Sequence, residues 1–167
     1  APDLPYVTAI WHYAQAMAAL RQERPEDAAK HYAALSTLAA DPILETLTVW
    51  DRYPLSHAVH IAERTVSAEL ALTRGDHRTA IATLREAVLI EHEIPYDEPP
   101  GWHAPVRQTL GVVLLAANQP AEAESVYREE LHRNPSNGWS LRGLATSLRA
   151  QKRDDEAAAA EQQLAAA

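Results

Sequence analysis

The sequence predicts an all-α fold, a solenoid of about four repeated helix-turn-helix units. Alanine is abundant, phenylalanine is absent and β-branched residues are few, a composition that favours helices over strands. A pattern of small and bulky residues recurs after 34 residues near the C-terminal end. Start signals for the second helix of a unit occur at four places along the chain.

These start signals let us place the helices in order. Pro25 and Pro120 suit a first helical position, and Asp76 and Asp154 suit N-caps. Acidic side chains follow in the first turns, where the helix dipole favours negative charge. We therefore expect helices near residues 6–22, 25–40, 56–74, 77–91, 105–118, 120–133, 138–151 and 154–166, with a short extra helix at 43–50.

The repeat is clearest between residues 105 and 166. A large-small pair early in the first helix is followed by a bulky residue, and a small residue then marks the second helix. The small residues let neighbouring helices approach closely. In the first unit, either Ala14 or Ala16 could take the small position. The matching positions are Leu110-Gly111, Leu114, Ala123, Tyr127 and Pro135, and then Leu144-Ala145, Leu148, Ala157 and Glu161.

This pattern resembles the tetratricopeptide repeat (TPR). Residues 105–166, with the preceding block Tyr96 to Trp102, look like the C-terminal TPR region of longer bacterial TPR proteins. The resemblance implies a right-handed solenoid and a scaffold that binds a protein or peptide. We expect a single TPR-array domain over 1–167, with repeats at about 6–40, 56–91, 105–135 and 138–167 and inserts at 41–55 and 92–104.

The charge and composition exclude several classes of partner. The formal net charge of −8 disfavours nucleic acid and anionic membrane surfaces. The absence of cysteine removes disulfides and thiolate chemistry, and no apolar run is long enough to span a membrane. A cytoplasmic location is slightly favoured over a periplasmic one. The opening Ala1-Pro2-Asp3 lacks Met, which is consistent with a piece of a longer chain.

The insert at residues 92–104 is the first candidate binding region. Ala123 and Ala157 lie 34 residues apart but Ala80 and Ala123 lie 43 apart, so the repeat is interrupted here. Prolines stiffen the segment and lower the entropy lost when it is ordered. Alternatively, the aromatic side chains pin the loop to the helices and an acidic one pairs with Arg107 or caps a helix. The candidate residues are Tyr96, Asp97, Glu98, Trp102 and His103.

The inner face of the first helices is the second candidate region. Arg142, Thr146 and Arg149 share one helical face, and a guanidinium can hold a carboxylate with two hydrogen bonds, so an acidic peptide could bind there. The alternative is that these arginines form intramolecular pairs. TPR domains that clamp acidic chaperone termini carry Lys and Asn in these positions, so we reject that activity. The corresponding residues of earlier repeats are Gln108, Val112 and Leu115, and Thr65, Glu69 and Leu72.

A metal or catalytic function has weak support. His57, His60 and Glu63 lie on about one helical face, but no fourth ligand is evident. The sequence has neither a glycine-rich phosphate loop nor a Gly-x-Ser-x-Gly elbow, and we expect no cofactor and no enzyme activity. Two alternatives stay open. One is a larger metal-dependent or enzymatic protein using His57, His60, His92 and His103, and the other is homo-oligomer formation through the alanine-rich C-terminal helix, 154–167.

Overall fold

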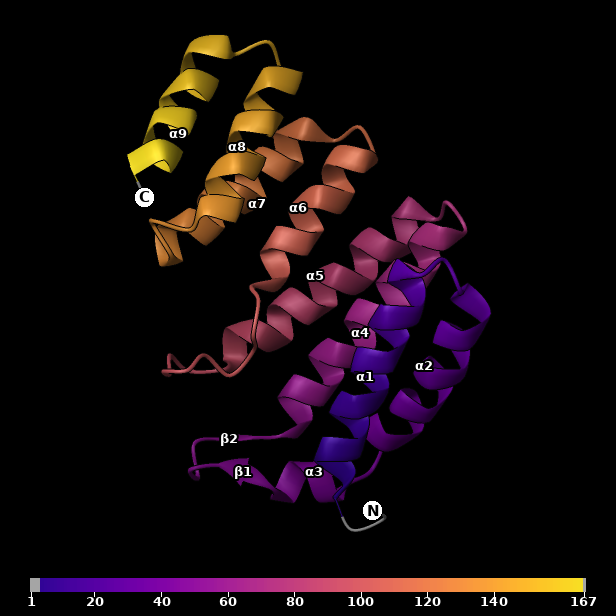
Figure 1. Ribbon diagram of the computed structural model, residues 1–167. Coiled ribbons are helices and arrows are strands. Elements are labelled where there is room, and N and C mark those ends of the chain that lie inside the picture. The colour runs from indigo at the N-terminus through magenta and orange to yellow at the C-terminus, as the bar shows by residue number, and fades with distance from the viewer. Residues whose placement is uncertain (1–3, 167) are drawn as a thin grey trace. The chain divides into compact units, whose positions relative to one another are not determined.

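The protein consists of helical hairpins, as shown in a computed structural model that describes residues 4–166 (Figure 1). Residues 1–3 and 167, including the opening Ala1-Pro2-Asp3, lie outside the described residues. The helices are α1 (Pro5–Arg21), α2 (Pro25–Ala39), α3 (Ile43–Thr46), α4 (Ser56–Thr73), α5 (His77–Glu93), α6 (Val106–Ala116), α7 (Pro120–Arg133), α8 (Gly138–Ala150) and α9 (Asp154–Ala166).

The eight predicted long helices are confirmed, with every end within two residues of its predicted position. Pro25 and Pro120 begin their helices, and the Asp76 carboxylate accepts a hydrogen bond from the Thr79 backbone amide (3.0 Å). Asp154 is the first helical residue of α9 rather than its cap. Ala16 is buried and Ala14 is exposed, so Ala16 takes the small position of the first repeat.

The extra helix predicted at 43–50 is wrong beyond Thr46, where α3 ends. The chain then forms a short antiparallel hairpin of β1 (Thr48–Val49) and β2 (Tyr53–Pro54), in which Val49 pairs with Tyr53. Trp50 and Asp51 turn the hairpin with φ of +48° and +58°. Left-handed backbone is incompatible with a continuing helix, so the predicted helix stops before this turn.

The four turns inside the helical hairpins share one geometry. In each, a residue two positions before the second helix has positive φ: Glu23, Gly75, Asn118 and Lys152. The next backbone amide then donates to a carbonyl five residues earlier, as from Arg24 to Ala19 (2.9 Å) and from Arg153 to Leu148 (3.0 Å). This is the Schellman closure of a helix end. The repeats are therefore structurally equivalent at these turns, although only one of the four residues is glycine.

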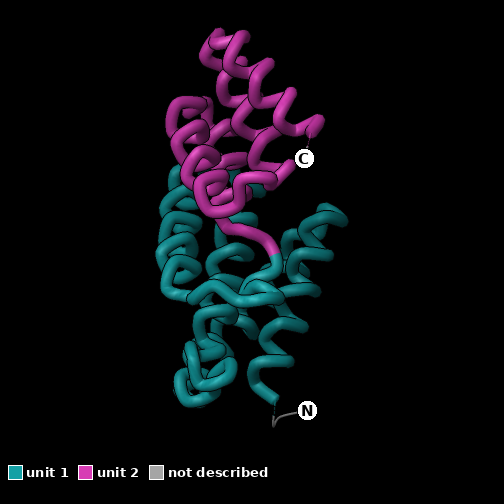
Figure 2. Tube along the Cα trace, turned by 90° about the vertical axis from the view of Figure 1, so that its left-hand side faces the viewer, with its two compact units in different colours: residues 1–103 teal, residues 104–167 magenta. Residues whose placement is uncertain are grey.

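The chain divides into two compact units, residues 1–103 and 104–167 (Figure 2). In unit 1, α4 packs against both α1 and α2, and the core includes Leu35, Val59 and Val66. In unit 2, α8 packs against both α6 and α7. The single array over 1–167 stays a prediction.

Tyr127 is the central side chain of unit 2. It is 2% exposed and lies against Gly111 of α6 and Gly143 of α8. A Cβ atom at either glycine would overlap the Tyr127 ring. Gly111 thus has the close-packing role that the repeat pattern predicted, and Gly143, which the pattern did not single out, has the same role on the next helix.

Candidate functional site

The exposed stripe of α8 carries the predicted A-helix residues of the last repeat. Arg142, Thr146 and Arg149 are all exposed, as is Trp139 one turn before Arg142. The Thr146 hydroxyl donates to the Arg142 carbonyl (2.9 Å), so it is bound to its own helix. We define Trp139, Arg142, Thr146 and Arg149 as the α8 stripe.

Arg149 is already bound within the protein. Its guanidinium donates to both carboxylate oxygens of Glu161 on α9 (2.8 and 2.6 Å), and Asp154 lies 4.0 Å away. The hydrogen bonds and charge of Glu161 raise the pKa of Arg149 above its ordinary value. An acidic partner would have to compete with Glu161 for this side chain.

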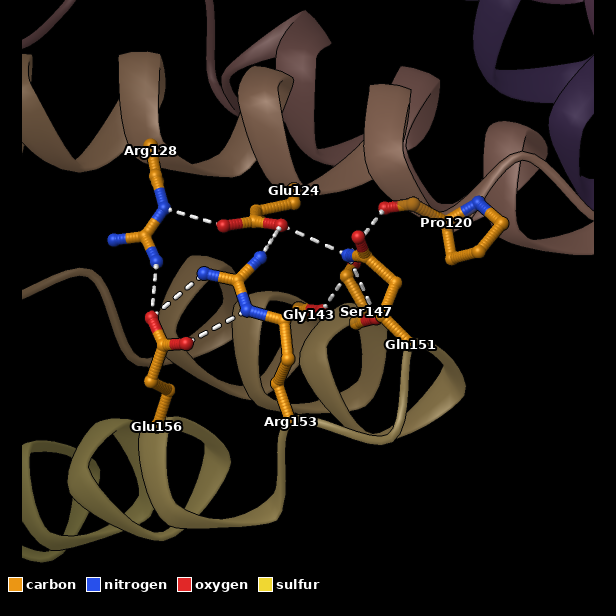
Figure 3. Close-up of polar contacts among 8 residues, drawn as sticks. All are labelled: Pro120, Glu124, Arg128, Gly143, Ser147, Gln151, Arg153 and Glu156. Atoms are coloured by element: carbon orange, nitrogen blue, oxygen red, sulfur yellow. Dashed lines mark hydrogen bonds and ion pairs between the residues drawn. The ribbon is translucent and has the colours of Figure 1, made fainter.

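Two further arginines of unit 2, Arg128 and Arg153, form a hydrogen-bond and ion-pair network around Glu124 (Figure 3). Glu124 accepts from Arg128 (2.8 Å), Gln151 (2.8 Å) and Arg153 (2.5 Å). Burial opposes the charged form of Glu124, but these hydrogen bonds outweigh it and lower the pKa of the carboxyl. Arg153 and Arg128 also contact Glu156. The network joins α7 to the turn between α8 and α9.

Arg142 and Trp139 differ from these paired residues. Among residues 4–166, no carboxylate lies within ion-pair distance of Arg142, and Trp139 is 74% exposed. Sequence reasoning missed Trp139, although it lies at i−3 from Arg142 and extending the stripe by one turn would have found it. Exposed tryptophan and arginine are the side chains most often found at binding hot spots.

The earlier repeats contribute less to an open inner face. Gln108 donates to the Asn137 side chain (2.9 Å), which in turn caps α8 by accepting from the Ser140 amide (3.0 Å). Val112 is 61% exposed and is the large apolar side chain of α6 that is open to solvent. Gln108 therefore positions the start of α8.

In unit 1, the predicted face of α4 is largely covered. Thr65 is 8% exposed and its hydroxyl donates to the Ile61 carbonyl (2.8 Å). Glu69 is 16% exposed and lies 3.6 Å from Arg21 of α1. This face is closed because α1 packs against α4.

The 92–104 insert divides into packed and exposed residues. Trp102 packs against the core of unit 1, with its ring 5.3 Å from that of Tyr13, and the His103 Nε2 atom lies 3.5 Å from the Tyr13 hydroxyl. Tyr96 is 80% exposed, and its hydroxyl donates to Glu98. Tyr96, Glu98 and His103 are thus the predicted loop residues that are exposed, and His103 also contacts Tyr13.

The two inserts meet, which sequence reasoning did not predict. Asp97 lies 3.2 Å from the guanidinium of Arg52 in the β1–β2 turn, and Arg52 also donates to the Tyr96 carbonyl (2.9 Å). A Cβ atom at Gly101 would lie 2.5 Å from the hydroxyl of Tyr53. The partner of Asp97 is therefore Arg52, on a segment 45 residues earlier, rather than the Arg107 considered from the sequence.

The two candidate metal-binding histidines of α4 have separate partners. His57 Nε2 lies 3.1 Å from Glu93, and His60 Nε2 lies 3.1 Å from the Ala39 carbonyl. Within residues 4–166, no three or more His, Asp or Glu side chains gather as a metal-binding group. His57 and His60 thus serve contacts between helices.

Comparison with known families identifies the repeat. The tetratricopeptide repeat model matches residues 3–42 and 109–167, more than half of the chain. The chain belongs to the tetratricopeptide repeat family. TPR domains generally act in protein–protein interactions, and the fold is typically a non-catalytic scaffold. No curated protein matches the sequence.

Solved TPR structures share this fold. Two structures of MamA AMB-1 each have a TM-score of 0.50 and 15% sequence identity with this chain. The matches cover 95% of this chain and 90% and 97% of the respective MamA chains. At this identity the likeness concerns the fold alone. In the part of this TPR protein that the structure describes, no helix is both long and apolar enough to cross a membrane.

Proposed function

We propose that this TPR protein is a non-catalytic scaffold that binds an acidic peptide segment through the exposed faces of α6 and α8. Trp139 and Val112 would contact an apolar side chain of the peptide, and Arg142 would bind a neighbouring carboxylate. The proposal rests chiefly on Trp139, which is 74% exposed one helical turn from an arginine without an ion pair among residues 4–166.

The repeat geometry supports a shared surface. Val112 on α6 and Thr146 on α8 are 34 residues apart, so they occupy equivalent positions of successive TPR units. These helices contact each other within unit 2. Covering an exposed tryptophan removes a large apolar area from water, which is worth about 1.5–3 kcal/mol for a large side chain. Arg142 adds a charged hydrogen bond that favours carboxylates.

The test is selection of peptides from a random display library with the whole chain as bait. Selected peptides should combine an acidic residue with an apolar one. Trp139→Ala and Arg142→Ala should each weaken their binding about tenfold, which corresponds to about 1.4 kcal/mol. Arg149→Ala should have a smaller effect because Glu161 already holds that side chain.

The matched control is Trp50→Ala, which removes another exposed tryptophan (70% exposed) from unit 1. Loss of binding in this variant, or selection of peptides without acidic residues, would contradict the proposal.

We further propose that Tyr96 and Glu98 of the 92–104 loop form a separate contact surface of unit 1. Tyr96→Ala in an affinity capture from the native source tests this second surface.

The other functions considered from the sequence stay predictions. In α9, Ala157 and Ala160 are buried, whereas Ala158, Ala159 and Ala165 are exposed and free for self-association. Light scattering as a function of concentration tests this alternative. Activity in a larger metal-dependent protein would require ligands beyond the separately bound His57 and His60.

A further inference from the structure

Two histidines of unit 1 meet across the first helical hairpin. The Nδ1 atoms of His12 on α1 and His31 on α2 lie 3.0 Å apart. Since a hydrogen bond needs one donor and one acceptor, this contact holds one proton between the two Nδ1 atoms. Both side chains are half-buried, so the pair can exchange protons with solvent. The pair lies in unit 1 and takes no part in the proposed peptide site, which lies in unit 2.

Trp11 restrains both imidazole rings. Its ring lies edge-on to His12, with centroids 4.8 Å apart, and edge-on to His31 at 5.4 Å. The two helices that carry the histidines also pack directly against each other. These contacts limit rotation of the imidazoles and keep the two Nδ1 atoms opposed, so a change in protonation acts on the contact between α1 and α2.

The pair can take up one proton without losing its hydrogen bond, but not two. The first proton binds Nε2 of the donor ring, and the resulting imidazolium donates from Nδ1 to the neutral partner as a charge-assisted hydrogen bond. In the neutral acceptor ring Nε2 already carries a proton, so a second proton must bind Nδ1. Both rings are then positively charged, and each presents an N–H group to the other across 3.0 Å. The second proton therefore breaks the contact.

We propose that His12 and His31 form a pH-sensitive switch that holds α1 against α2 near neutral pH and loosens the first helical hairpin in acid. Burial and the charge of His31 lower the pKa of His12 below its ordinary value of 6.5. The folded state thus binds this proton less readily than the unfolded chain does. The stability that His12 contributes is therefore present above pH 6.5 and is lost as the pH falls through the lowered pKa.

Neighbouring charged and titratable groups of α1, α2 and α4 make contacts of a different kind. Their carboxylates face cations or a hydroxyl, and their histidines face oxygen atoms, which can accept a hydrogen bond from a protonated imidazole. Mild acid therefore does not set two donors against each other in these contacts. They join Asp27 with Arg24 and Lys30, Glu69 with Arg21, Glu63 with Ser36 and Arg64, His57 with Glu93, His60 with the Ala39 carbonyl, and Tyr13 with His103.

The switch can be tested by titrating the full, untagged chain from about pH 8 to about pH 5, the range in which histidine changes charge. Nitrogen-15 spectra of the imidazoles should show one Nδ1 proton in the pair at the upper end and two at the lower end. Amide exchange in residues 5–39, corrected for its intrinsic pH dependence, should accelerate about fivefold on acidification, since one hydrogen bond changes an opening equilibrium by about that factor. Residues 120–166 of unit 2 provide the internal reference and should keep their corrected rates.

Substitutions distinguish this pair from a general effect of acid. His31→Gln supplies an amide oxygen that does not titrate and can accept from a protonated His12, so the acceleration in residues 5–39 should disappear. His103→Gln removes a histidine that contacts α1, and His132→Gln removes an exposed histidine of unit 2; both variants should respond as the wild type does.

Two results would overturn the proposal. One is acceleration in His31→Gln equal to that of the wild type, and the other is a wild-type pair with both Nδ1 atoms protonated and unchanged exchange in residues 5–39. The second result needs no variant, so it decides the matter should His31→Gln fail to fold.

Discussion

The absence of a side chain at Gly143 lets α8 approach the Tyr127 ring of α7 closely. Replacing a helical glycine by alanine usually stabilises a protein by about 0.5–1 kcal/mol. At Gly143 the added methyl would overlap the buried Tyr127 ring, and such overpacking costs about 1–3 kcal/mol. Gly143→Ala should therefore lower the free energy of unfolding, measured by urea denaturation, despite its better helix propensity.

Gly138→Ala is the matched control, because its Cβ would meet only the flexible end of Leu164 (3.2 Å). This variant should keep or slightly raise the stability. An equal loss in both variants would show that the effect comes from the backbone rather than from the Tyr127 ring.

The hydroxyl of Tyr127 gives a pH prediction. Burial raises its pKa to about 12, whereas an unfolded tyrosine has a pKa near 10. Between these values the unfolded state loses the proton and the folded state keeps it, so stability is intact below pH 10 and falls as the pH rises toward 12. Ultraviolet titration should show a tyrosine that ionises near pH 12 and is absent in Tyr127→Phe, and that variant should lose less stability over this range.

At the scale of elements, the meeting of the two inserts rests largely on Arg52. Arg52→Ala removes its bonds to the Tyr96 carbonyl and to Asp97, whose side chain is only 11% exposed. We expect a local loss of about 1 kcal/mol, since Arg52 itself is partly exposed. Amide exchange in residues 94–103 should then accelerate about fivefold in mass spectrometry. Arg24→Ala, which breaks a surface pair with Asp27, should leave this segment unchanged.

The helices could be predicted because the residues that start them act locally in the sequence. The contacts between the two inserts could not be predicted in this way. Pro25 marks a helix start through its fixed backbone φ and Asp76 through its side-chain cap, so the sequence alone placed both. Asp97 and Arg52 are brought together by the packing of α4 and α5, which lie between them in the sequence, and no spacing rule encodes that pair. Of the candidate site, Arg142 was predicted from helical periodicity, whereas the pairing of Arg149 depends on where α9 packs.

At the scale of the whole molecule, a destabilising substitution in one unit should accelerate amide exchange in that unit and not in the other. In repeat proteins each unit is stabilised mainly by its own core and its nearest neighbours. Gly143→Ala should therefore accelerate amide exchange throughout α6–α9, and α1 and α2 should keep their protection.

A destabilising substitution in unit 1 completes this test. Ala16 is fully buried in unit 1, so Ala16→Val should overpack that core and accelerate exchange in α1, α2 and α4, while α8 and α9 stay protected. Equal acceleration in both units by either variant would show that residues 4–166 unfold as one cooperative domain, as the single-array prediction for 1–167 implies. Separate responses would mean that a partner can bind α8 without depending on the fold of unit 1.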